Sequence, residues 1–114
     1  MRLLTSLLFV TALLFAQDYD RARSMVQRVQ DDLQRLLDKR PRDGKERERI
    51  NNARKHLSDF DRKLRENKFD KDRLDSSIDD VKNVVENNTL EPEDRDMMSA
   101  DLKDLRGLRA GDGR

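Results

Sequence analysis

Apolar residues recur along this chain at alternating intervals of three and four, the spacing that gathers side chains on one face of an α-helix. The first series is Tyr19, Ala22, Val26, Val29, Leu33 and Leu36, with Met25 and Leu37 beside it, and the second is Ile50, Ala53, Leu57, Phe60 and Leu64. Pro41 and the turn-forming pair Asp43-Gly44 separate the two series. The pattern predicts antiparallel helices at about residues 18–40 and 44–67.

Two further helices are expected in the second half of the chain. Asp43 and Glu46 have the spacing of a capping box at the start of the second helix, and Asp70 is the expected N-cap of a third. Phe69 and Leu74 flank Asp70 at the positions of a hydrophobic staple. The third apolar series is Leu74, Ile78, Val81, Val84 and Val85, and the fourth is Met97, Met98, Leu102, Leu105 and Leu108. These series predict helices at about 70–87 and 91–108, followed by a frayed tail at 109–114.

Four helices joined by short loops predict an all-α fold, a small antiparallel four-helix bundle built from two helical hairpins. The alternative is a three-helix bundle with a short fourth helix. We expect one domain, because 114 residues are too few for two ordinary domains.

The first sixteen residues differ from the rest of the chain. Arg2 precedes an apolar run from Leu3 to Phe15, and Ala16 is followed by the polar segment that starts at Gln17. This layout is typical of a secretory signal peptide cleaved between Ala16 and Gln17. The run is shorter than the roughly 20 apolar residues that span a bilayer. We therefore expect a mature chain of residues 17–114, periplasmic or secreted, without an integral membrane segment.

Composition excludes several classes of protein. The chain has no Cys and a single His, which excludes disulfide scaffolds, Cys-ligated zinc and thiol catalysis, and leaves little for a Ser/His/Asp hydrolase. Its 25 basic and 24 acidic residues lack the positive excess of a nucleic-acid binder. Without Arg2 the mature chain has 24 of each, a net charge of zero.

The neutral total hides two oppositely charged halves. Residues 17–68 carry 16 basic and 11 acidic side chains, a net of +5, whereas residues 69–114 carry 8 and 13, a net of −5. We expect this complementarity to favour the pairing of the two hairpins. The same charges would support self-association if the hairpins separated.

One pair of residues suggests a cofactor. His56 lies beside the second apolar series and Met25 beside the first, about one helical turn apart in an antiparallel hairpin that turns near residue 42. A His/Met pair can ligate haem iron. The chain thus resembles the small secreted four-helix bundles that bind haem, in size, compartment and ligand types only, because its last helix has no His.

Other motifs carry less chemistry. No series of acidic residues completes a calcium loop or a di-iron site, so no metal site is expected. Asn87-Asn88-Thr89 matches a glycosylation sequon at Asn87, which matters only in a eukaryotic source.

The favoured function is therefore that of an extracytoplasmic helical protein, without enzymatic activity or cofactor, that binds a protein partner or itself. Haem or metal binding through His56 and Met25 is the first alternative. Action on membrane surfaces through the basic second helix is the second, and its apolar face is narrow for that role.

Overall fold

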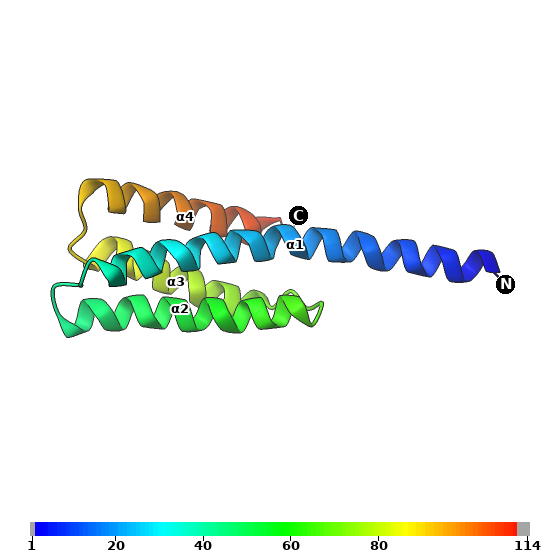
Figure 1. The fold of residues 1–114 in the computed structure, drawn as a ribbon, viewed down its shortest axis with the longest axis horizontal. Coiled ribbons are helices and arrows are strands. Elements are labelled where there is room, and N and C mark those ends of the chain that lie inside the picture. Colours follow the sequence, from blue (N-terminus) through cyan, green and yellow to red (C-terminus); the bar gives the residue numbers. More distant parts are fainter. Residues whose placement is uncertain (1, 112–114) are drawn as a thin grey trace.

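The computed structural model describes residues 2–111, with side chains from Tyr19 onward. It is built from four helices: α1 (Arg2–Asp38), α2 (Gly44–Arg65), α3 (Lys71–Asn87) and α4 (Pro92–Ala110). Each helix packs against its neighbour in the chain, and α4 returns to pack against α1. The described part of the chain is therefore an antiparallel four-helix bundle, as the sequence predicts (Figure 1).

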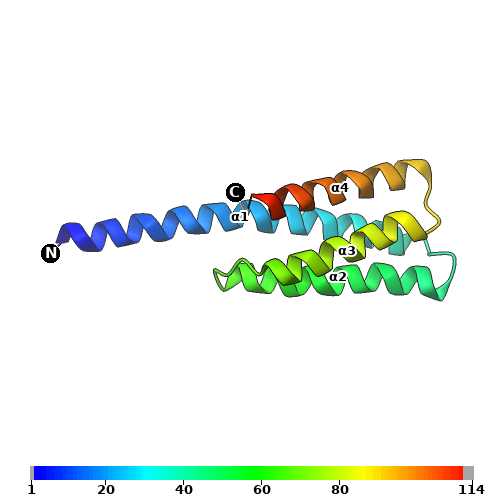
Figure 2. The ribbon, with the colours of Figure 1, turned by 180° about the vertical axis from the view of Figure 1, so that it is seen from behind.

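The predicted signal peptide falls on the N-terminal part of α1. Its Met1, and the side chains of residues 2–18 including Ala16 and Gln17, lie outside what the structure describes. The backbone of α1 begins at Arg2 rather than near residue 18, and no Gly or Pro interrupts it before Asp38. This part of α1 extends past the ends of the other helices (Figures 1 and 2).

Helices α1 and α2 end earlier than expected, and a residue with a positive φ angle follows each of them. Arg40 and Asn67 have φ angles of 58° and 60°, in the left-handed region that usually follows a helix end. Helix α1 therefore ends at Asp38 rather than Arg40, and α2 at Arg65 rather than residue 67. At the other terminus α4 continues to Ala110, so the expected tail at 109–114 starts later, and residues 112–114 lie outside the described range.

The apolar series form the core. Every member of the second series is at most 1% exposed, and Phe60 is the largest of the fully buried side chains. On α3 the fully buried face is rotated from the predicted one: Leu74, Ser77, Val81 and Val84 point inward, while Ile78 and Val85 are half-buried. The Ser77 hydroxyl donates to the Arg73 carbonyl at 2.9 Å, which satisfies it within the core.

Aromatic rings close the end of the bundle where α2 turns into α3. Phe69 meets Phe60 edge to face with ring centroids 5.4 Å apart, and it stacks on Tyr19 at 6.4 Å. The Asp70 side chain accepts a hydrogen bond from the Arg73 amide at 3.1 Å, so Asp70 caps α3 as predicted.

Opposite charges face each other between the two hairpins. Between α1–α2 and α3–α4 each ion pair described has its base on the first hairpin and its acid on the second: Arg28 with Asp101 and Asp104, Lys39 with Glu91 and Asp94, and His56 with Asp80. The basic first half and the acidic second half of the sequence therefore contact each other through ion pairs between the hairpins.

Candidate interaction site at the loop end

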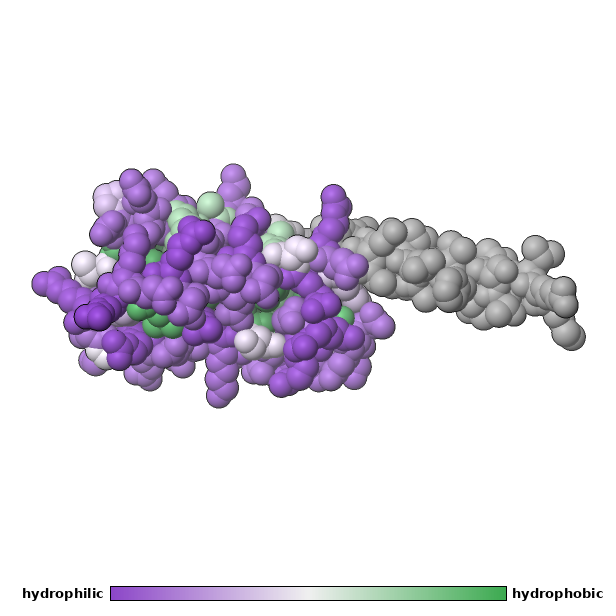
Figure 3. Space-filling view, viewed as in Figure 1, coloured by the Kyte–Doolittle hydropathy of each residue, from purple (hydrophilic) through white to green (hydrophobic). Residues whose placement is uncertain are grey.

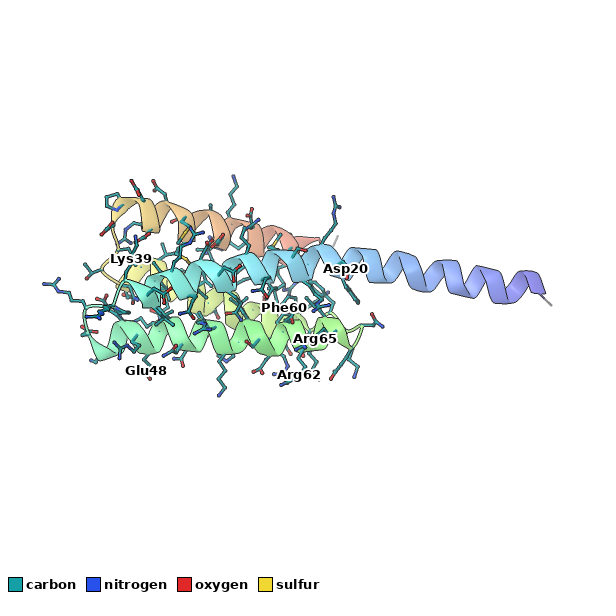
Figure 4. The ribbon with its side chains drawn as sticks, viewed as in Figure 1. Asp20, Lys39, Glu48, Phe60, Arg62 and Arg65 are labelled. Atoms are coloured by element: carbon teal, nitrogen blue, oxygen red, sulfur yellow. The ribbon has the colours of Figure 1, made fainter. Side chains whose placement is uncertain are left out.

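The loop between α1 and α2 and the loop between α3 and α4 lie side by side at one end of the bundle (Figure 1). Between them is a pocket of about 280 Å³. Its lining comes from both loops and the helix ends that flank them: Leu36, Lys39, Arg40, Pro41, Arg42, Glu46, Ile50, Asn88, Thr89, Leu90, Glu91 and Asp94. Figure 4 shows Lys39 at this end and Phe60 in the body of the bundle.

A buried polar network fixes the two loops against each other. Asp43 caps α2 by accepting from the Glu46 amide at 2.9 Å, as the sequence predicts. The Glu46 side chain, only 6% exposed, does not reach back to complete a capping box; it accepts from the Thr89 amide at 3.1 Å. The Asn88 side chain donates to the Glu46 carbonyl at 3.0 Å and accepts from Arg49 at 3.2 Å. Glu46 therefore joins α2 to the far loop.

An ion pair forms one wall of the pocket. The Lys39 ammonium lies 2.8 Å from a carboxylate oxygen of Asp94 and 3.8 Å from one of Glu91. The hydrogen bond from Lys39 to Asp94 raises the pKa of the Lys39 ammonium. The carboxylates of Asp94 and Glu91 therefore both have an ion-pair partner within the protein.

Four other basic side chains at this end, unlike Lys39, have no described acid partner. Arg40, Arg42, Lys45 and Arg47, here called the basic turn, are all exposed, and among the described residues none has an ion-pair partner. Asp43 and Glu46, the acids between them, cap α2 and bind Thr89. The turn therefore presents four bases without a described ion pair beside the pocket, with the exposed Glu48 next to Arg47.

The structure does not bring His56 and Met25 together. The His56 Nδ1 atom contacts the Asp80 carboxylate on α3 in a short hydrogen bond. Met25 lies on the flank of α1 that continues to Arg28, which bonds to Asp104 on α4. The two residues thus face opposite seams of the bundle. The haem hypothesis loses the juxtaposition on which it depended.

Sequence patterns alone did not identify one pair of buried acids. Asp32 on α1 and Asp101 on α4 are 7% and 3% exposed and lie next to each other between the two helices. Burial, followed by the neighbouring Asp32 carboxyl, raises the pKa of Asp101 to about 7. The signal was present, because Asp94 and Asp101 continue the three-four spacing of Met98, Leu105 and Leu108.

Three further findings concern the described residues. Nowhere among them do three His, Asp or Glu side chains gather to hold a metal ion. None of the helices, within that part, combines the length and apolar content needed to cross a membrane. Asn87 of the sequon is exposed and bonds to Asn83, whereas Asn88 is buried.

No family model, curated protein or solved structure matches this chain.

Proposed function

We propose that residues 17–114 act outside the cytoplasm, after removal of a signal peptide, as a non-enzymatic helical protein that binds a protein partner through the loop end of the bundle. One observation carries this proposal: four exposed bases close together in sequence, those of the basic turn, have no described ion-pair partner and lie beside a pocket.

The rigidity of the loop end supports a binding role. Its two loops are linked by the Glu46 and Asn88 hydrogen bonds, and each is short. Binding costs less conformational entropy when the surface is already ordered. An ordered surface of this kind favours the binding of one specific partner more than a flexible surface would.

The size and lining of the pocket favour a macromolecular partner. Small-molecule sites generally enclose about 300 to 1,000 Å³ and are lined mainly by apolar and aromatic groups. This pocket, at about 280 Å³, has no aromatic lining and is half rimmed by charged residues. It suits a side chain of a partner better than a whole cofactor.

Self-association is the less favoured version of the proposal. The opposed charges that could join two copies are already in contact across the hairpins of one chain. The outer surface is mostly hydrophilic, with apolar residues in narrow strips, and offers no broad apolar face for a second copy in the view of Figure 3.

Site-directed crosslinking tests the proposal. Because the chain has no Cys, one can be introduced at Lys45 in the basic turn or at Lys68 at the opposite end, two exposed lysines without a described ion pair. Each full-length variant is expressed in its source cell and labelled with a photoreactive group. We expect one discrete protein adduct from Lys45→Cys and none from Lys68→Cys. Equal adducts from both positions, or none from Lys45→Cys, would refute the assignment of the loop end.

Export is tested on the same material. We expect the purified protein to begin at Gln17 and to fractionate outside the cytoplasm. A cytoplasmic chain that retains residues 1–16 would contradict the signal peptide. The crosslinking result would still test the loop end as a binding site.

A further inference from the structure

We propose that the pocket between the two loops receives one apolar side chain from an acidic segment of the partner protein, with Arg40 and Arg42 pairing with the carboxylates that flank it. This inference rests on the proposed function and specifies the chemistry of the partner at the same site.

The floor of the pocket is apolar. Leu36 and Ile50, 4% and 1% exposed, belong to the core, and their inner surfaces are covered by the bundle. Pro41 and the half-buried Leu90 extend this surface toward the two loops. A partner side chain that enters the pocket therefore buries apolar area against the end of an existing core.

The rim of the pocket carries three bases and three acids, and among these charged groups Arg40 and Arg42 are the two with neither an ion pair nor a hydrogen bond described for the side chain. Its three acids already have partners: Glu46 accepts from the Thr89 amide, while Asp94 and Glu91 pair with Lys39. Arg40 and Arg42 line the same pocket, and neither has a described ion pair, although Asp43 directly follows Arg42. Guanidinium groups bind carboxylates through paired hydrogen bonds. The two unpaired arginines therefore favour a partner with acidic residues.

The backbone fixes the arginines in place. Arg40 adopts the left-handed conformation, and its amide donates to the Leu37 carbonyl at 3.0 Å. Pro41 follows directly and restricts the chain between the two arginines. Non-glycine residues seldom adopt this conformation, and such strain concentrates at functional positions. A glycine would end α1 more easily but would supply no charge.

A protein segment fits these features better than other polyanions. Nucleic acids and anionic membranes require a broad basic surface, and here Lys39 and its two acids interrupt the charge. Neither offers a single apolar side chain of the size of the pocket. An acidic peptide offers both parts of the required chemistry.

Titration of the isotope-labelled full-length chain with synthetic peptides, followed by NMR, provides the test. The probe carries two Asp or Glu residues on each side of one Leu. Its comparators replace the Leu by Ser, or the acids by Asn and Gln. We expect the amide signals of residues 36–50 and 88–94 to shift with the probe, and each comparator to bind about tenfold more weakly.

The protein variants separate site binding from general charge attraction. Arg40→Gly with Arg42→Ser removes two positive charges at the pocket, and Lys103→Ser with Arg106→Ser removes two from exposed positions on α4. Only the first pair is expected to weaken binding by about tenfold. Circular dichroism confirms that both remain helical.

Three results would overturn the inference: equal binding by the two double variants, equal binding of the probe and its Leu-free comparator, or tighter binding of anionic phospholipid vesicles or single-stranded DNA at the same residues. A crosslinked partner at Lys45→Cys combined with any of these results leaves the proposed function intact and rejects only the acidic-segment chemistry.

Discussion

The adjacent asparagines Asn87 and Asn88 end α3 in opposite environments. Asn87 is exposed, and its side chain donates only to Asn83 of the same helix, while its backbone carbonyl accepts from Arg49 at 3.4 Å. Asn88 is 4% exposed and connects Glu46 and Arg49 of α2 to the loop before α4. The same side chain is thus a surface group at one position and a structural link at the next.

Replacement of each asparagine by alanine should separate these roles. Asn88→Ala removes the buried hydrogen bond to the Glu46 carbonyl and the acceptor of Arg49, and we expect a loss of about 2 kcal/mol in the free energy of unfolding. Asn87→Ala should change it by no more than about 0.5 kcal/mol. Urea denaturation followed by far-UV circular dichroism measures both. Similar losses for the two variants would show that the loop network does not stabilise the fold.

The left-handed residues Arg40 and Asn67 provide a second comparison. The conformation costs an ordinary L-residue about 1 to 2 kcal/mol, whereas glycine adopts it freely and gives up about 0.5 to 1 kcal/mol through its more mobile unfolded state. Arg40→Gly should therefore stabilise the protein by about 0.5 to 1 kcal/mol. Asn67→Gly should have almost no effect, because asparagine tolerates the conformation. A destabilised Arg40→Gly variant would mean that the arginine makes contacts that offset its strain.

At the scale of elements, the sequence predicts helices better than it predicts what joins them. The three-four spacing depends only on neighbours along one helix, so all four apolar series were correctly assigned to helices. The contact of Glu46 with Thr89 spans 43 residues and depends on how two loops meet. The local spacing of Asp43 and Glu46 instead suggested a capping box, because it contains no information about partners of Glu46 that are distant in sequence.

The seam between α1 and α4 is the clearest case of this limit. Asp101 falls within the three-four series of α4, but its burial beside Asp32 becomes visible only when the two helices are placed together. The Asp101 Oδ2 atom is buried and receives no hydrogen bond from a donor group. Arg28, 3.6 Å from Asp101, and Arg35, 3.9 Å from Asp32, are the bases beside the pair, and Asp104 is the further acid. Burial and the neighbouring carboxyl therefore favour the protonated form of Asp101.

This seam should make stability depend on pH. The pKa of Asp101 is raised from 3.8 to about 7 on folding, so between these values the folded state holds a proton that the unfolded state has lost. The free energy of unfolding therefore falls as pH rises from about 4 to 7 and levels off above that, with a total change of a few kcal/mol. Denaturation by urea at pH 5.5 and 8.5 measures it.

Two substitutions identify the group responsible. Asp101→Asn keeps the size of the side chain without a titrating proton, so most of the difference between pH 5.5 and 8.5 should disappear. Asp104→Asn, at a more exposed carboxylate of the same helix, should retain it. Both are made in a His56→Gln background, which removes the only imidazole. A pH dependence that survives Asp101→Asn would assign it to another group.

At the scale of the whole molecule, the two hairpins carry opposite net charges. Residues 17–68 and 69–114 carry net charges of +5 and −5, and the ion pairs described between hairpins join the basic half to the acidic half. We expect synthetic hairpins 17–68 and 69–111 to be weakly helical alone, because each exposes half of a core. Mixed in equal amounts, they should form a helical one-to-one complex, detected by circular dichroism and sedimentation.

Salt and charge reversal test whether electrostatics directs that pairing. At about 0.5 M salt the Debye length falls to a few ångströms, so association of the hairpins should weaken while a complex persists through the apolar core. Lys39→Glu in the first hairpin places an acid beside Asp94 and Glu91 and should weaken association at low salt; Asp94→Lys in the second should restore part of it. If each hairpin instead formed a stable homodimer, or if neither salt nor reversal changed the affinity, apolar packing alone would set the pairing and the divided charge would have no part in it.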